Sequence, residues 1–318
     1  MTCFEPIFAG RRASRPRSQM NDTDSAMTIR PRRSVLYMPG ANARAMEKAR
    51  TLPCDAVILD LEDAVAPGAK ETARGQVMAA VVAGGFGGRD VIVRINGLDT
   101  AWWRDDLAAA AKAHPDGILV PKVSKAAHLH TIAGRLLDIA ADHKIKVWAM
   151  IETPLAIINA AEIAATARDA ETRLAGFVMG TNDLAKETRA KLLHGRAPMV
   201  PWLATAVLAA HAYGIDILDG VYNDIADEEG FRRECGQGRD MGFDGKTLIH
   251  PNQIAPCNVA FSPSEVEIAQ ARKIIAAFEL PENQAKGVVQ LDGRMVERMH
   301  ADMARRTVAI ADAISARS

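Results

Sequence analysis

Two carboxylates follow two neighbouring apolar segments of the sequence. Glu152 closes the segment WAMIE, and Asp183 follows the next such segment, in VMGTNDL. If these segments are adjacent parallel strands, the two carboxylates surround a common point. Oxygen ligands without a Cys or His cluster suit a hard cation such as Mg²⁺, with Mn²⁺ as the alternative. The residues alone also allow a plainer interpretation, in which Glu152 caps a helix ahead of Pro154 and Asp183 caps a turn or helix.

Further charged residues lie in or directly after similar apolar segments. Arg94 stands inside VIVRI, where a charge is costly unless it pairs with a carboxylate or holds an anionic oxygen of a ligand. Asp60 and Glu62 are two residues apart and therefore face the same side of the predicted strand, and Asp63 follows. These acids either orient metal-bound water or neutralise Arg94, although Asp63 also suits a helix N-terminus. Lys122 in VPKV binds a substrate anion or forms an ion pair, and the nearby acids argue against a Schiff-base lysine.

A repeated strand–helix pattern indicates which elements bring these residues together. Short segments rich in Val, Ile and Leu alternate with Ala-rich helical stretches, as in buried parallel strands joined by helices. Eight such units predict an α/β fold, a (β/α)₈ TIM barrel, whose chemistry lies at the carboxyl ends of the strands. A doubly wound sheet is disfavoured because no GxGxxG follows the first strand. The predicted strands are 34–38, 56–62, 91–95, 117–123, 147–152, 176–180, 216–222 and 246–250.

Three regions divide the chain. Residues 1–32 are rich in Arg, Ser and Pro and have no periodic apolar pattern, so we expect a disordered tail. Residues 33–260 are the expected catalytic barrel, and residues 261–318 a C-terminal helical lid extension that packs outside the barrel or on a neighbouring subunit. Ser264 and Glu267 have the spacing of a capping box at the start of the first helix of this extension.

Composition excludes several classes of protein. The 39 Lys and Arg balance 39 Asp and Glu, which argues against a polybasic nucleic-acid binder and an acidic disordered protein. No apolar run approaches the roughly 18–20 residues that span a bilayer. The four cysteines are scattered without zinc-like spacing, so we expect reduced thiols in a cytoplasmic protein with neither nucleic-acid nor membrane partners.

Seven ordered motifs resemble the HpcH/HpaI aldolase/citrate lyase family, in its branch of citrate lyase β-subunit-like CoA-ester lyases. The resemblance implies a Mg²⁺-dependent TIM barrel that forms homotrimers or homohexamers. It also implies that Glu152 and Asp183 bind Mg²⁺ and that Arg94 binds the acyl group and stabilises the thioester enolate. Glu62 and Asp63 are further candidate catalytic residues because of the roles given above, orienting metal-bound water or neutralising Arg94. The motifs are RSVLYMPGANARAMEKA, DAVILDLEDAVAPGAKETAR, VIVRINGLDT, GILVPKV, MIETPLAIINAAEIA, GTNDLAKE and GKTLIHPNQI.

Coenzyme A contacts follow from the same resemblance. Tyr37, Lys48, Ile249 and His250 stand at positions that contact CoA in malyl-CoA lyases of the family, so an acyl-CoA is the expected substrate. Asn42 stands where those enzymes carry an Arg for the CoA phosphates.

One departure from the family pattern bears on the reaction. Family lyases place a catalytic Asp, in a motif like DGxMID, in the extension that reaches a neighbouring subunit, whereas this chain reads DGRMVE with Glu297 there. Glu carries the carboxylate one methylene further, which changes the geometry of proton transfer and favours a base that acts on water.

The resemblance therefore implies hydrolysis of (3S)-malyl-CoA to malate and CoA, with a lid shared between subunits. The alternative is C–C cleavage of malyl-CoA or methylmalyl-CoA to acetyl-CoA or propionyl-CoA plus glyoxylate. A citrate lyase β-type subunit is less favoured because of the C-terminal extension.

Overall fold

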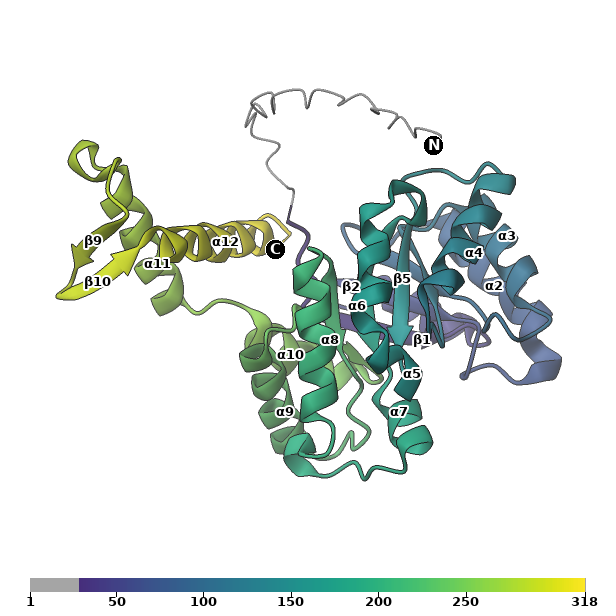
Figure 1. Ribbon diagram of the computed structural model, residues 1–318. Coiled ribbons are helices and arrows are strands. Elements are labelled where there is room, and N and C mark those ends of the chain that lie inside the picture. Colours follow the sequence, from purple (N-terminus) through teal and green to yellow (C-terminus); the bar gives the residue numbers. More distant parts are fainter. Residues whose placement is uncertain (1–28, 318) are drawn as a thin grey trace, which may run out of the picture.

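A closed barrel of eight parallel strands forms the body of the protein (Figure 1). The computed structural model describes residues 29–317. Each strand pairs with the next along the chain, and the first pairs with the eighth to close the barrel. The predicted TIM barrel is thus confirmed. The strands are β1 (Ser34–Pro39), β2 (Ala56–Asp60), β3 (Asp90–Arg94), β4 (Gly117–Val120), β5 (Lys146–Ile151), β6 (Leu174–Met179), β7 (Asp216–Asp219) and β8 (Gly245–Leu248).

Alternating side chains of these strands form two cores. Ile58, Ile92, Leu119 and Trp148 point inward and fill the barrel with other apolar residues, as in other barrels of this size. The side chains between them face outward and pack under the helices in one large cluster. Because both faces of the strands are buried, they read as continuous apolar runs in the sequence.

Three of the helices on the outside of the barrel begin at a residue whose side chain caps them. The side chains of Asn42, Thr153 and Asp227 each accept a backbone N–H from the first turn of the helix that follows. The helices are α1 (Ala43–Ala49), α2 (Lys70–Ala83), α3 (Trp103–Ala113), α4 (Ala126–Asp138), α5 (Pro154–Ile158), α6 (Ala160–Ala165), α7 (Thr181–Thr188), α8 (Val200–Ala212), α9 (Glu228–Met241) and α10 (Ile254–Phe261).

Several strands end earlier than the sequence pattern predicts. The carboxylate of Asp60 accepts the backbone N–H groups of Glu62 and Ala64, which turns the chain out of the sheet after β2. Lys122 has a positive φ of 54°, which ends β4 before it. His250 likewise follows β8 in a loop. Glu62, Lys122, Glu152 and His250, predicted within strands, therefore lie on the loops at the carboxyl rim of the barrel, whereas Asp60 and Arg94 are the last residues of their strands.

The opposite end of the barrel is covered by the segment that precedes β1. The Arg32 guanidinium lies 4.9 Å from the centre of the Trp148 ring and forms ion pairs with Asp90 and Asp216. Of the predicted tail, residues 1–28 lie outside the described residues.

Within residues 29–317, no helix is long and apolar enough to cross a membrane. Cys54, Cys235 and Cys257 are buried free thiols in the same part of the chain.

The last part of the chain forms an arm, residues 262–317, that extends away from the barrel (Figure 1). It has a small core of its own, made of Phe278, Val289, Val296 and Ala301. The predicted capping box at its start is present between Ser264 and Glu267. The arm consists of α11 (Glu265–Glu279), the hairpin strands β9 (Val288–Leu291) and β10 (Arg294–Glu297), and α12 (Arg298–Ser315).

A buried charge cluster links β7 and β8 to α9. The ammonium group of Lys246, which has no exposed surface, donates to Asp219 Oδ2 at 2.9 Å and to Glu234 Oε1 at 2.7 Å. Arg196 reaches the other oxygen of Asp219 at 2.6 Å. Removing one member of such a cluster leaves the others buried with unbalanced charge, which destabilises the fold strongly.

We therefore expect Lys246→Met to lower the free energy of unfolding by about 3 kcal/mol, because Asp219 and Glu234 lose a buried cation. Urea unfolding followed by circular dichroism measures this change. Arg232→Met is the matched control, since the exposed Arg232–Glu228 pair on α9 should contribute less than about 0.5 kcal/mol. Equal losses in the two variants would contradict the expectation.

Candidate active site

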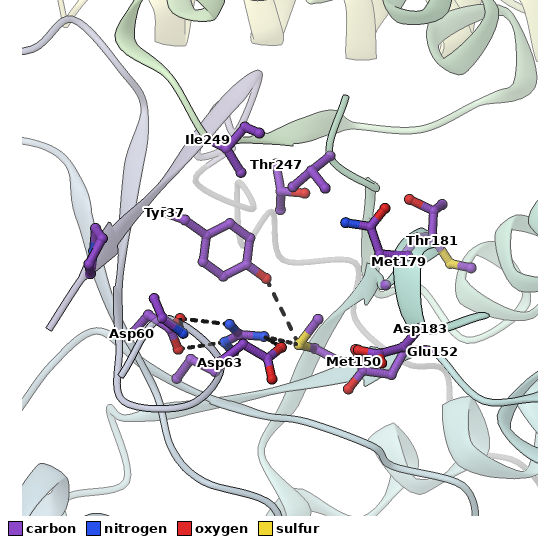
Figure 2. A pocket seen from close by; sticks show the side chains of 16 residues that line it. Tyr37, Asp60, Asp63, Met150, Glu152, Met179, Thr181, Asp183, Thr247 and Ile249 are labelled. Carbon is purple, nitrogen blue, oxygen red and sulfur yellow. Dashed lines mark hydrogen bonds and ion pairs between the residues drawn. The ribbon is translucent and has the colours of Figure 1, made fainter. Parts of the chain in front are cut away.

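A pocket of about 380 Å³ opens at the carboxyl ends of the barrel strands. Figure 2 shows Asp60 and Asp63 on one side of it and Glu152 and Asp183 on the other, with Tyr37 between them. Residues that are far apart in the sequence thus line one concave site, as the strand-end argument predicts.

Arg94 is held in place by Asp60 at the end of the adjacent strand. Its Nε donates to Asp60 Oδ1 at 2.7 Å and its Nη2 donates to Oδ2 at 2.6 Å. Burial alone would raise the pKa of Asp60, but Arg94 and the backbone N–H groups of Glu62 and Ala64 hold it below its usual range. Arg94 therefore forms an ion pair with a carboxylate, one of the two interpretations that the sequence allowed. This pair fixes the plane of the guanidinium.

The third nitrogen of the guanidinium contacts residues other than Asp60. Nη1 lies 2.8 Å from Glu62 Oε2, 3.4 Å from Asp63 Oδ2 and 3.7 Å from Met150 Sδ. The guanidinium carbon lies 5.0 Å from the centre of the Tyr37 ring, which lines the same pocket. Nη1 is thus the guanidinium nitrogen that contacts Asp63 and Met150, two residues that line the pocket.

Glu62 connects Arg94 to Lys122. The Lys122 ammonium donates to Glu62 Oε1 at 2.6 Å, so the ion-pair interpretation of this lysine holds. Burial would lower the pKa of Lys122, but the hydrogen bond and the charge of Glu62 raise it above its usual value. Lys122 is accordingly a charged, paired lysine, which disfavours the Schiff-base alternative.

Glu152 is almost fully buried, and its two oxygens have different surroundings. Oε1 accepts the backbone N–H of Lys122 at 2.7 Å, whereas Oε2 has no hydrogen bond within the part of the chain that the structure describes. Burial raises the pKa of Glu152 to about 8, and the negative charge of Glu62 adds to the rise. The N-cap of α5 is Thr153, so the capping interpretation of Glu152 fails.

Asp183 lies in the first turn of α7, after the N-cap residue Gly180. Its carboxylate has neither a hydrogen bond nor an ion pair among residues 29–317, and its charge is a further cause of the raised pKa of Glu152. The two carboxylates therefore repel each other across one wall of the pocket (Figure 2).

These surroundings fit a divalent cation. A Cβ atom at Gly180 would lie 2.4 Å from Glu152 Oε2, so only glycine leaves room for this carboxylate. A cation would relieve the repulsion between Glu152 and Asp183 and favour the ionised form of Glu152. Since the described residues contain no cluster of three or more metal-ligating side chains, Mg²⁺ would take its remaining oxygen ligands from water and substrate.

The other predicted site residues are divided between the pocket and the surface. Tyr37 and Ile249 line the pocket. Lys48 is exposed on α1, and His250 caps the short helix η5 (Pro251–Gln253); neither lines the pocket. Glu297 is exposed where β10 meets α12, on the arm that extends away from the barrel (Figure 1).

Several lining residues escaped the sequence argument. Met150 lies two residues before Glu152 and Thr247 two before Ile249, so the alternation of a strand would have identified both as facing the mouth. Gly180 has no comparable signal, because its role depends on the approach of Glu152 from the neighbouring strand.

Known proteins similar to this chain share its architecture and length. Residues 33–251 match the family model described as HpcH/HpaI aldolase/citrate lyase. A (3S)-malyl-CoA thioesterase of Cereibacter sphaeroides is 51% identical over 286 residues, which cover 90% of this chain and 96% of that protein. An L-malyl-CoA/β-methylmalyl-CoA lyase of the same organism is 34% identical, over 90% of this chain and 96% of that protein.

A solved structure agrees with these matches. The CitE protein of Mycobacterium tuberculosis, in complex with magnesium, acetoacetate and coenzyme A, superposes with a TM-score of 0.70 at 30% identity. The superposition covers 89% of this chain and 98% of that one. By the family model and by its relatives, the chain belongs to the HpcH/HpaI aldolase/citrate lyase family.

Proposed function

We propose that this chain is a Mg²⁺-dependent enzyme that hydrolyses the thioester of (3S)-malyl-CoA to malate and CoA. The observation that carries the proposal is the placement of Glu152 and Asp183, two carboxylates that form no ion pair among the described residues, across one pocket from the Arg94 guanidinium. The name of the Cereibacter relative, which is matched over nearly its whole length, supports the choice of substrate and reaction.

In this proposal each wall of the pocket binds one end of the acyl group. When bound on Glu152 and Asp183, Mg²⁺ (or Mn²⁺) would supply positive charge for the carboxylate and hydroxyl oxygens of the malyl group. Arg94 Nη1 would donate to the thioester oxygen and stabilise the negative charge that develops on it. Asp60 keeps the guanidinium in this orientation throughout the reaction.

Coenzyme A would extend from the pocket along the rim of the barrel. Tyr37 and Ile249 would contact the part of CoA nearest the thioester, since both line the pocket. Lys48 and His250 lie outside the pocket and would contact more distant parts of CoA. Glu62 and Asp63 would keep Arg94 charged and oriented beside the thioester.

Glu297 of a neighbouring copy would act as the base that takes a proton from the attacking water. This assignment is supported by its position on an exposed arm that extends away from the barrel of its own chain (Figure 1). We therefore propose residues 33–260 as the catalytic domain and residues 261–318 as a lid shared between subunits of a homotrimer or homohexamer.

C–C cleavage of malyl-CoA or methylmalyl-CoA is the second candidate. The name of the 34% identical lyase supports it, and the same binding geometry would serve it. The position of Glu297, one methylene longer than the Asp of the lyases that the sequence resembles, favours hydrolysis.

Product analysis separates the two reactions. We expect purified protein incubated with Mg²⁺ and (3S)-malyl-CoA to release free CoA and malate in equal amounts, because water attacks the thioester carbonyl. Liquid chromatography with mass spectrometry identifies the products. Formation of acetyl-CoA and glyoxylate would overturn the thioesterase proposal in favour of the lyase.

Isosteric neutral variants test the metal ligands. We expect Glu152→Gln and Asp183→Asn each to lower kcat/KM by at least about 100-fold, because each removes an anionic metal ligand. Titration calorimetry with Mg²⁺ alone should show the matching loss of affinity. Glu187→Gln, an exposed position on the same helix as Asp183, is the control and should retain both properties. Full Mg²⁺ affinity in both site variants would refute the ligand assignment.

A mixed oligomer tests whether the lid is shared. Glu297→Ala and Arg94→Ala subunits should each be inactive alone, whereas refolded mixtures should regain activity in about a quarter of their sites, which combine an intact barrel with an intact arm. Activity measured against the mixing ratio gives this fraction. Mixtures that stay inactive would show that each site is built from a single chain.

A further inference from the structure

Lys122 adopts a backbone conformation that is uncommon for a residue with a side chain. Its φ of 54° lies in the left-handed region, which non-glycine residues occupy at a cost. His114, Arg173 and Arg189 also have positive φ, but each is the residue that terminates a helix, where this conformation is common. Lys122 instead follows a barrel strand, in the loop after β4. The end of a helix therefore does not account for the positive φ of Lys122, and we look to its contacts in the site for the reason.

The backbone of Lys122 determines where Glu152 lies. The N–H of Lys122 donates to Glu152 Oε1 at 2.7 Å, which leaves Oε2 directed into the space beside Gly180. The loops after β4 and β5 are joined a second time by the hydroxyls of Ser124 and Thr153, which lie 2.9 Å apart. The left-handed turn is thus part of a contact between two neighbouring strand ends.

The side chain of Lys122 contacts the half of the site that contains Glu62 and Arg94. Its ammonium, on a side chain that is 38% exposed, binds Glu62 Oε1 at 2.6 Å. The second oxygen of Glu62 lies 2.8 Å from Arg94 Nη1, the guanidinium nitrogen that Asp60 does not bind. Glu62 is thereby held between two cations.

We propose that Lys122 is a positioning residue that links the two halves of the site. Its backbone N–H orients Glu152 toward a metal, and its ammonium orients Arg94 through Glu62. The inference deepens the proposed function and rests on it, because it takes Glu152 as a metal ligand. It assigns separate roles to the backbone conformation and to the charge of one residue, so the two are separable by substitution.

The backbone role is tested by two variants that both lack the ammonium. Glycine adopts a positive φ without strain, whereas a β-branched valine does not. We expect Lys122→Gly to bind Mg²⁺ within about threefold of wild type and Lys122→Val to bind it at least about tenfold more weakly, the scale of losses when a residue that orients a metal ligand is removed. Titration calorimetry with Mg²⁺ alone gives both affinities without any need for turnover.

The ammonium role is tested on Lys122→Gly itself. Its kcat/KM for (3S)-malyl-CoA should fall about 10- to 100-fold although its Mg²⁺ affinity is retained, because Arg94 loses the charge that orients it through Glu62. A merely structural lysine would not separate these two measurements. Retained kcat/KM in Lys122→Gly would overturn this part of the inference.

Controls separate local strain from an effect on the site. His114→Gly and His114→Val repeat the comparison at another positive-φ position, after α3 and before β4, and should change thermal stability but leave Mg²⁺ affinity unchanged. If Lys122→Val does not fold, Lys122→Asn and Lys122→Ala replace it, since Asn tolerates positive φ better than Ala.

The outcomes also distinguish this inference from the function on which it rests. Equal Mg²⁺ affinity in the Gly and Val variants, beside a wild type that binds Mg²⁺, would overturn the backbone role alone. A wild type that binds no Mg²⁺ would overturn the metal site and with it the positioning of Glu152.

Discussion

The site depends on the pair of hydrogen bonds between Asp60 and Arg94. A guanidinium inside a barrel strand is costly unless a carboxylate accompanies it into the interior. Asp60 meets this requirement at the end of the adjacent strand, and its two oxygens match the fork of the guanidinium. With two of its three nitrogens bound to Asp60, the plane of the Arg94 guanidinium is fixed, and its third nitrogen meets Glu62, which Lys122 binds from the other side.

A second constraint is the unequal distribution of charge in the mouth. On the side of Arg94 the acids form ion pairs with Arg94 or Lys122, whereas Glu152 and Asp183 form no ion pair in the part of the chain that the structure describes. The two walls are therefore suited to opposite partners. One presents a donor to a developing anion, and the other presents acceptors to a cation.

Much of the barrel and its mouth could be predicted from the sequence because their causes are periodic. Buried parallel strands leave continuous apolar runs, and the parallel order brings every strand end to one rim, which is why Arg94, Glu152 and Asp183 were found together. What could not be predicted depends on single backbone angles and close approaches. The turn formed by Asp60, the positive φ of Lys122 and the space beside Gly180 leave no repeating pattern in the residues.

The arm has a hydrophobic core of its own, and few polar contacts join it to the barrel, among them that of Arg306 with Asp244. Its packing is therefore largely independent of the residues that line the pocket. In evolutionary terms the two parts are free to diverge separately. If the arm delivers the proton-transfer group, a lineage that altered the arm would acquire a different reaction on the same acyl-CoA, while the barrel that recognises the ligand stayed as it was.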